Sequence, residues 1–202
     1  MRSESLSPTS GLHHSSSETF FPPKATIYCE GAPRFRSRSA RDLGCLLDVD
    51  PRVASWQCMP LTLDINGSKH TPDFLVTYDT GRMTLLDVVN GEERGPSFSL
   101  AAADIGLEHS FVSRRSIEAG PRLRNASDLL RYGAYRTPLG DRVRILALLD
   151  EFGAIRLADA LTVFREAPPM AGLASLILHR FLSVDLDVDF IGPEMMVRRG
   201  ER

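Results

Sequence analysis

The chain has 202 residues, of which 43% are hydrophobic and 25% are charged, and its formal net charge is −2. This balance fits a globular protein with one or two cores, and the charge alone gives no indication of nucleic-acid binding. No apolar run approaches the roughly 20 residues of a membrane helix, and no secretory core opens the chain, so we expect a cytoplasmic protein that has no membrane partner. Three widely spaced cysteines predict reduced thiols and neither a zinc site nor a disulfide framework.

The first part of the chain combines a polar tail with a basic helix. Residues 1–25 are rich in Ser, Thr and Pro and lack apolar periodicity, which predicts a disordered tail. Ser37 or Ser39 can cap a helix that runs to about Leu47, and Asp50-Pro51 ends it. Arginines at the start of this helix fit a solvated helix terminus and a phosphate contact equally well. They are Arg34, Arg36, Arg38 and Arg41.

Strands and a short helix follow. Residues 53–64 read as a strand, and Asn66-Gly67 supplies a tight hairpin turn. A helix is expected over 97–105, and another strand over 108–113. Mixed strands with helices before and between them predict an α/β domain over residues 26–117.

A second hairpin is the central feature of this domain. Apolar runs at 74–78 and 83–89 are separated by Asp79-Thr80-Gly81, which provides the glycine that a tight turn needs. Asp73 lies at the start of the first run and Asp87 near the end of the second. The hairpin brings these carboxylates toward one sheet edge, where oxygen ligands can hold a hard divalent cation. The sequence thus predicts a candidate metal site at Asp73 and Asp87.

A basic connector follows at residues 118–137. Asn125 or Ser127 can cap a helix within it that continues to Tyr135. The arginines around this connector are the best candidates for a DNA-backbone surface, although an internally paired, solvated linker explains them equally well. The arginines selected as DNA-binding candidates, together with two from the first helix, are Arg38, Arg41, Arg114, Arg115, Arg122 and Arg124.

Residues 138–202 have a different organisation. Helices are expected from Pro138, over 157–165 and over 170–182, followed by strands at 184–186 and 196–198. Three helices and a hairpin in this order predict a smaller, helical, winged-helix-like domain. The hairpin carries three aspartates that would repel phosphates, which favours contact with a protein over contact with DNA. They are Asp185, Asp187 and Asp189.

Several motifs in order resemble those of TnsA, the endonuclease subunit of heteromeric cut-and-paste transposases and a member of the PD-(D/E)XK nuclease superfamily. They are DLGCLLDVDP, PLTL, TPDFLV, LLDV and IEAGPRLRNASDLLRY, and the resemblance covers about residues 30–199. It implies a restriction-endonuclease-like α/β domain followed by a winged-helix-like domain. It also implies Mg²⁺-dependent hydrolysis of DNA, and a protein partner (a transposase or ATPase subunit) that binds through the C-terminal domain.

The family's catalytic pattern is only partly present. Asp73 matches the PD aspartate, and Asp87 is a shorter replacement for the acidic residue of the next strand. Val89 stands where the family has its lysine, and Ala40 stands where it has its helix glutamate. Two of the four catalytic functions are therefore missing, and we expect Mg²⁺ to bind weakly or not at all.

Substitute groups are available nearby in sequence. Lys69 lies four residues before Asp73 and could replace the lysine, while Glu92 or Glu93 could supply a carboxylate. The leading expectation is a catalytically impaired TnsA-like protein of a mobile-element system that binds DNA or a partner. One alternative is an active Mg²⁺-dependent endonuclease that cuts transposon ends with relocated or partner-supplied residues. A second is a DNA-binding transcriptional regulator.

Overall fold

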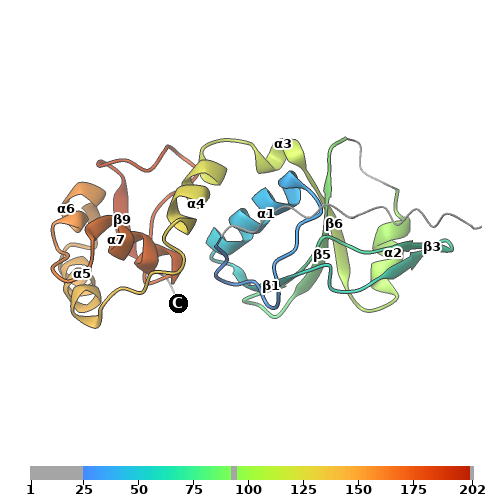
Figure 1. The fold of residues 1–202 in the computed structure, drawn as a ribbon, viewed down its shortest axis with the longest axis horizontal. Coiled ribbons are helices and arrows are strands. Elements are labelled where there is room, and N and C mark those ends of the chain that lie inside the picture. Colours follow the sequence, from blue (N-terminus) through green and yellow to red (C-terminus); the bar gives the residue numbers. More distant parts are fainter. Residues whose placement is uncertain (1–24, 92–94, 201–202) are drawn as a thin grey trace, which may run out of the picture.

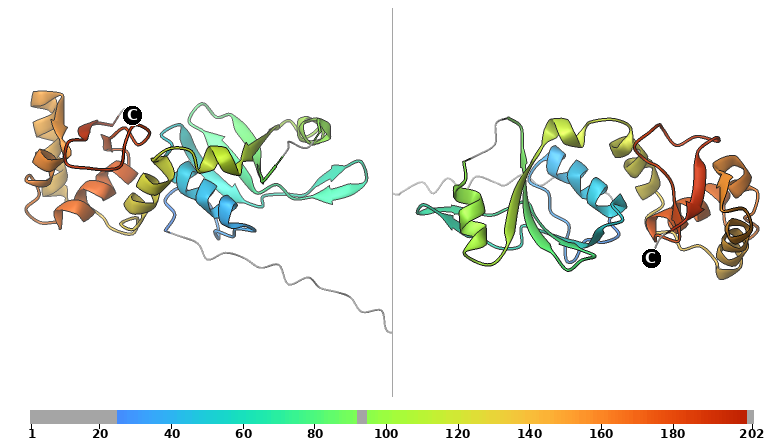
Figure 2. Two further views of the ribbon diagram at one scale, coloured as in Figure 1. Left: turned by 90° about the horizontal axis from the view of Figure 1, so that it is seen from above. Right: turned by 180° about the vertical axis from the view of Figure 1, so that it is seen from behind.

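The computed structural model describes residues 25–91 and 95–200 (Figure 1). The predicted disordered tail and the candidate carboxylates Glu92 and Glu93 lie outside these residues, apart from the tail's last residue. The described part is a mixed α/β protein in which a sheet with its helices and a mainly helical region lie side by side (Figures 1 and 2). None of its helices combines the length and the apolar character needed to cross a membrane.

The first helix forms where the capping signal predicts it. Helix α1 spans Arg38–Val49, and the Ser37 side chain accepts a hydrogen bond from the Ala40 N–H at 2.9 Å. Asp50 is extended, as expected before a proline, and ends the helix. The predicted helix and its Ser37 cap are therefore confirmed.

Four strands form the main sheet in the order β1-β4-β5-β6. They are β1 (Val53–Cys58), β4 (Phe74–Tyr78), β5 (Met83–Val89) and β6 (Glu108–Ser113). Neighbouring strands are antiparallel except for β5 and β6, which are parallel. The predicted central hairpin is confirmed as β4 and β5, with Gly81 in its turn at φ +81°. Parallel pairing of β6 with β5 places the ends of both strands at one edge of the sheet.

The prediction of one strand over residues 53–64 is wrong. Strand β1 ends at Cys58, because Met59 has a φ of +46° and Pro60 has no N–H to donate to a ladder. The chain resumes as β2 (Leu63–Ile65), which pairs with β3 (Ser68–His70) across the predicted Asn66-Gly67 turn. These two strands form a separate hairpin that projects beside helix α2 (Ser97–Ala103; Figure 1).

Both faces of the main sheet are covered. Helix α1 packs on one face, where Phe35, Trp56 and Phe74 form an aromatic cluster at the centre of the core. Helix α2 (Ser97–Ala103), shorter than the predicted 97–105, packs through Ala102 on the opposite face. A short helix, α3 (Arg114–Ile117), follows β6 directly and was not predicted.

Helix α4 (Arg122–Leu130) links the sheet to the C-terminal region and begins earlier than predicted. Asn125 does not cap this helix, because its side chain is buried and hydrogen-bonds to a distant loop. The helix begins after Pro121. Cys45 of α1, Leu129 of α4 and Leu178 of helix α7 (Pro169–Leu178) meet in a core that joins the two regions.

The C-terminal region contains three helices of different lengths and a small sheet of strand order β7-β9-β8. Its elements are α5 (Leu139–Phe152), β7 (Ala154–Arg156), α6 (Leu157–Leu161), α7 (Pro169–Leu178), β8 (Leu182–Ser183) and β9 (Met196–Arg199). The predicted helices at 157–165 and 170–182 are shorter here, and the strand expected at 184–186 lies instead at 182–183. Strand β7 was missed because three residues give too little periodicity to recognise.

A buried carboxylate fastens the start of α5 to the segment before α7. Asp141 has no solvent-exposed surface and accepts hydrogen bonds from the backbone N–H groups of Arg165, Glu166 and Ala167 at 2.8, 3.0 and 2.7 Å. Arg144 pairs with the same side chain at 2.5 Å. Burial raises the pKa of Asp141, but the three backbone hydrogen bonds outweigh burial and hold the pKa below its usual value.

Candidate functional site

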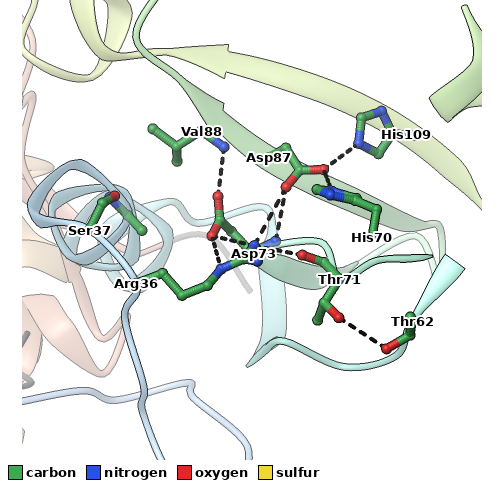
Figure 3. A network of polar contacts seen from close by, with 10 residues as sticks. Arg36, Ser37, Thr62, His70, Thr71, Asp73, Asp87, Val88 and His109 are labelled. Carbon is green, nitrogen blue, oxygen red and sulfur yellow. Dashed lines mark hydrogen bonds and ion pairs between the residues drawn. The ribbon is translucent and has the colours of Figure 1, made fainter. Parts of the chain in front are cut away.

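The two aspartates of the central hairpin meet at one end of β4 and β5, the two central strands of the main sheet (Figure 3). Asp73 immediately precedes β4, and Asp87 lies near the C-terminal end of β5, opposite Phe111 of β6. The backbone N–H of Asp73 donates to Asp87 Oδ1 at 3.3 Å, so the two residues are direct neighbours. The structure therefore brings together the two residues that the sequence selected.

Arg36 occupies the space between the two carboxylates. Its Nε and Nη2 donate to Asp73 Oδ1 at 3.1 and 2.9 Å, and Nη2 lies 3.8 Å from Asp87 Oδ1. The same Nη2 donates to the backbone carbonyl of Thr71 at 2.6 Å. The second oxygen of Asp73 accepts the Val88 N–H at 2.9 Å. A guanidinium thus places one positive charge beside this acidic pair.

The position of Arg36 follows from its neighbours in sequence. Phe35 is buried in the aromatic core, and Ser37 caps α1, so the backbone on both sides of Arg36 is fixed. The Arg36 side chain, which is 32% exposed, then reaches across the strand ends to Asp73. A charge-assisted contact at 2.9 Å to a carboxylate that is 12% exposed is stronger than a typical surface ion pair.

Two histidines hold Asp87. Its Oδ2 lies 2.7 Å from His70 Nε2 and 2.8 Å from His109 Nε2. His109 is fully enclosed, and its Nδ1 has no hydrogen-bond partner among the described residues. The tautomer with hydrogen on Nε2 therefore satisfies Asp87 and leaves no buried N–H unpaired. Burial raises the pKa of Asp87, but the hydrogen bonds from His109 and His70 outweigh burial, and the pKa lies below its usual value.

Aromatic packing fixes the two imidazole rings. Phe98 of α2 lies edge-on to His70, with ring centroids 4.9 Å apart, and its ring is 5.6 Å from that of His109. Phe111 packs against His109 at 4.6 Å. Both histidines are therefore held in place by their neighbours as well as by Asp87.

A cavity of about 500 Å³ opens beside this cluster. Arg36, His70 and the two aspartates form one part of its wall, and the end of β5 with the following turn forms the other. Its lining residues are Arg36, Ser37, His70, Asp73, Asp87, Val88, Val89, Asn90, Gly91 and Phe111. The polar cluster thus faces a space large enough for a small ligand or for one unit of a polymer.

The positions that differ from the TnsA pattern have clear surroundings. Val89 lines the cavity and is paired in register with Ser113. Ala40 is 1% exposed and packs in the core beneath α1. Lys69 is exposed on β3, and because side chains alternate along a strand it is directed away from the face where His70 meets Asp87. The structure does not bring Lys69 to the wall of the cavity.

The residues at this site do not fit a divalent cation in the observed arrangement. No group of three or more His, Cys, Asp or Glu side chains in the described ranges is placed to hold a metal ion. The Arg36 guanidinium already lies between the two carboxylates. Oxygen-rich coordination of Mg²⁺ would require this guanidinium to move away.

The arginines predicted to bind DNA divide into two sets. Arg38, Arg114 and Arg115 are exposed, and α3 packs beside α1 next to the end of β6. Arg38 follows the cavity residue Ser37 in the chain, and Arg114 and Arg115 follow Ser113, the register partner of the cavity residue Val89. These three residues form what we call the cavity rim.

The other three arginines have partners in the protein. Arg41 is 17% exposed and pairs with Asp42 at 3.3 Å. Arg122 pairs with Asp187 at 2.6 Å, and Arg124 stacks on the ring of Phe190 at 4.7 Å. Arg41 and Arg122 are partly buried, whereas Arg124 is exposed but has its guanidinium stacked on Phe190.

Sequence reasoning missed the roles of Arg36, His70 and His109. Arg36 was one of several arginines near a helix start, and only its neighbours Phe35 and Ser37 indicate that its backbone is fixed. His109 could have been found from the strand pairing: Phe111 lies opposite Asp87, so His109 projects from the same sheet face two residues earlier. That argument needs the parallel register, which the sequence does not specify.

The chain matches no protein-family description and no curated protein sequence. The resemblance to TnsA therefore depends on the sequence motifs and has no independent support from these two comparisons.

Proposed function

We propose that this chain is a TnsA-like nuclease homologue that binds DNA along the cavity rim without cutting it. The observation that carries the proposal is Arg36, whose guanidinium lies between Asp73 and Asp87 in the place that a catalytic metal needs. Metal-dependent hydrolysis of a phosphodiester requires a cation that can contact the substrate and a group that positions the attacking water. Here the positive charge beside the aspartates belongs to the Arg36 side chain, which is fixed to the protein. Val89 stands at the position where the family has its lysine.

Under this proposal, the two regions have the folds that the resemblance to TnsA implies. Residues 26–117 would be the restriction-endonuclease-like unit, supported by a mixed four-stranded sheet with α1 and α2 on opposite faces. Residues 138–202 would be the winged-helix-like unit, supported by α5, α6 and α7 followed by a small sheet.

Binding to the DNA backbone is supported by the charge around the cavity. Arg38 and Arg115 are exposed and form no ion pair with any described residue, so their charges are available to phosphates. Arg114 pairs with Glu118 at 2.7 Å, but both side chains are about half exposed. Such a pair is weak in water, and a phosphate can replace the glutamate at low cost.

Helix α7 is poorly suited to read base sequence. Seven of the ten residues of this helix are buried, among them Leu173 and Leu176 in the C-terminal core and Leu178 in the core that joins the two regions. A recognition helix needs an exposed face that can enter the major groove. We therefore expect contacts mainly to phosphates and little preference for sequence, which counts against the transcriptional-regulator alternative.

A plasmid-nicking assay in Mg²⁺ or Mn²⁺, together with fluorescence anisotropy on labelled duplex DNA, tests the proposal. We expect binding without nicking. Arg38→Glu and Arg115→Glu should each weaken binding at least about tenfold and lower the salt slope by about one phosphate contact. Arg165→Glu, which changes an exposed arginine in the loop before α7, is the charge-matched control.

An active endonuclease is the second candidate, because Asp73 and Asp87 converge on an open cavity with His70 beside them. It predicts metal-dependent nicking that is lost in Asp73→Ala. That result would overturn the non-cutting proposal. Equal DNA affinity of wild type and the two cavity-rim variants would contradict the proposal that the cavity rim binds DNA.

A further inference from the structure

The loop between β8 and β9 exposes apolar side chains far from the cavity. Val188 is 79% exposed, Phe190 53% and Met196 37%, and all three line a groove of about 520 Å³ in the C-terminal region. Pro193 and Met195 contribute to the same wall. Exposed apolar side chains that share one concave surface are typical of binding sites.

This loop is held rigidly, so its exposure is built into the fold. Asn125, which is 1% exposed, donates to the backbone carbonyls of Leu186 and Asp189 at 2.9 and 2.8 Å and accepts the Ile191 N–H at 3.0 Å. Leu186 is itself buried in the core shared by α1, α4 and α7. A buried amide thus fixes the loop backbone while Val188 and Phe190 remain in solvent. A preordered surface loses little conformational entropy when it binds.

The groove has an acidic rim. Asp185, Asp189 and Glu194 line it, against a single base, Arg198. Glu194 lies 3.5 Å from Arg156 but is 76% exposed. Asp185 and Asp189 form no ion pair with any residue in the described part of the chain. A ligand with positive charge would meet carboxylates that are not neutralised by the protein.

Phe190, which lines the groove, already contacts a cation of the protein itself. The Arg124 guanidinium lies 4.7 Å from the centre of the Phe190 ring. A cation over an aromatic face is attracted by the ring's quadrupole, and the ring is still 53% exposed beyond this contact.

We infer that this groove docks a cationic, amphipathic segment of a protein partner. Apolar side chains of the segment would pack on Val188, Phe190 and Met196, and its lysines or arginines would meet Asp185 and Asp189. The negative rim excludes DNA as the occupant, because phosphates would be repelled. The inference concerns a surface separate from the cavity rim, so it does not depend on DNA binding.

A designed peptide tests the groove directly. The probe is a fluorescein-labelled peptide of Leu, Lys and Ala whose leucines are spaced three and four residues apart, and binding to the full chain is followed by anisotropy. Two further peptides are the controls: one has Glu in place of Lys, and one has the same composition without an apolar face. Saturable binding of the first peptide alone is the expected result.

Protein variants locate the binding. Phe190→Ser and the double change Asp185→Asn with Asp189→Asn should each weaken peptide binding at least about tenfold. Phe152→Ser and Asp104→Asn change another exposed aromatic residue and another exposed acid, and should leave affinity within about twofold. Circular dichroism and duplex-DNA affinity, unchanged in all variants, would show that fold and cavity rim are intact.

Three results would overturn the inference. They are the absence of saturable peptide binding, equal weakening by the control variants, and equal binding of all three peptides. Sedimentation equilibrium addresses a second copy of the chain as the occupant. A concentration-dependent dimer that disappears in Phe190→Ser would assign the groove to self-association and count against a separate partner.

Discussion

Buried carboxylates are held in two different ways in the two regions of this protein. In the C-terminal region, Asp141 has three of its partners on the backbone, within residues 165–167. At the edge of the main sheet, Asp87 is held by the side chains of His70 and His109, and Asp73 mainly by Arg36. All three acids are poorly accessible, but only the second arrangement faces a cavity.

The difference indicates which acids serve stability and which remain available for binding. Backbone N–H groups cannot leave Asp141 unless the segment before α7 unfolds. The Arg36 side chain, which is 32% exposed, can rotate away from Asp73 while the fold is retained, because the cost is confined to a few hydrogen bonds. We therefore regard Asp141 as a structural residue and the cluster of Arg36, Asp73 and Asp87 as exchangeable.

The largest effect is expected from Asp141→Asn. This change removes the negative charge and one acceptor oxygen, so either the Arg165 N–H or the Glu166 and Ala167 N–H groups lose their buried acceptor. We expect the free energy of unfolding to fall by about 3 kcal/mol, measured by urea denaturation. Asp159→Asn, which alters an exposed pair with Arg156, is the control and should change stability little. Similar losses in both variants would contradict a special role for Asp141.

The pH dependence of stability gives a second test. The pKa of Asp141 is lowered in the folded protein, so its stabilising effect is complete above the unfolded pKa of about 3.9. It is lost as pH falls through the folded value. The difference in unfolding free energy between wild type and Asp141→Asn should therefore be constant from about pH 5 to 7 and shrink below about pH 4. A difference that persists unchanged at pH 3 would show that the charge of Asp141 contributes nothing.

Arg36→Gln tests whether the cavity cluster is exchangeable. Removing the guanidinium leaves Asp73 Oδ1 without Arg36 and takes away the positive charge beside Asp87 Oδ1, and we expect about 5 mM Mn²⁺ to raise the melting temperature by about 3 °C. Wild type and the control Arg38→Gln should shift by less than about 1 °C. Adding Asp73→Ala to Arg36→Gln should abolish the response. Equal shifts in wild type and Arg36→Gln would show that Arg36 does not compete with a cation.

The smallest effect on stability is expected at the cavity rim. Arg114 and Glu118 form an exposed pair at 2.7 Å, which water screens strongly. Arg114→Ala should therefore change the free energy of unfolding by less than about 0.5 kcal/mol while weakening duplex-DNA binding. A stability loss comparable to that of Asp141→Asn would place Arg114 with the structural residues.

Local signals in the sequence predicted most of the elements of the sheet region. Ser37, Gly81 and Asn66-Gly67 each act through their own backbone neighbourhood, so the helix start and both hairpins could be read directly. One error came where a single residue had to satisfy two demands. Asn125 has the chemistry of a cap, yet it is buried and holds the β8–β9 loop.

The sequence by itself determined that Asp73 and Asp87 lie together, because a hairpin with an obvious turn brings them to one edge. It also determined that Ala40 and Val89 cannot perform acid–base or charge-based catalysis, since neither side chain ionises. Only the tertiary structure decided what surrounds the two aspartates. Arg36 reaches them from the segment before α1, and His109 reaches them through the parallel pairing of β6, contacts that span 37 and 22 residues. Local propensity carries no information about such long-range contacts, which form only when the core packs.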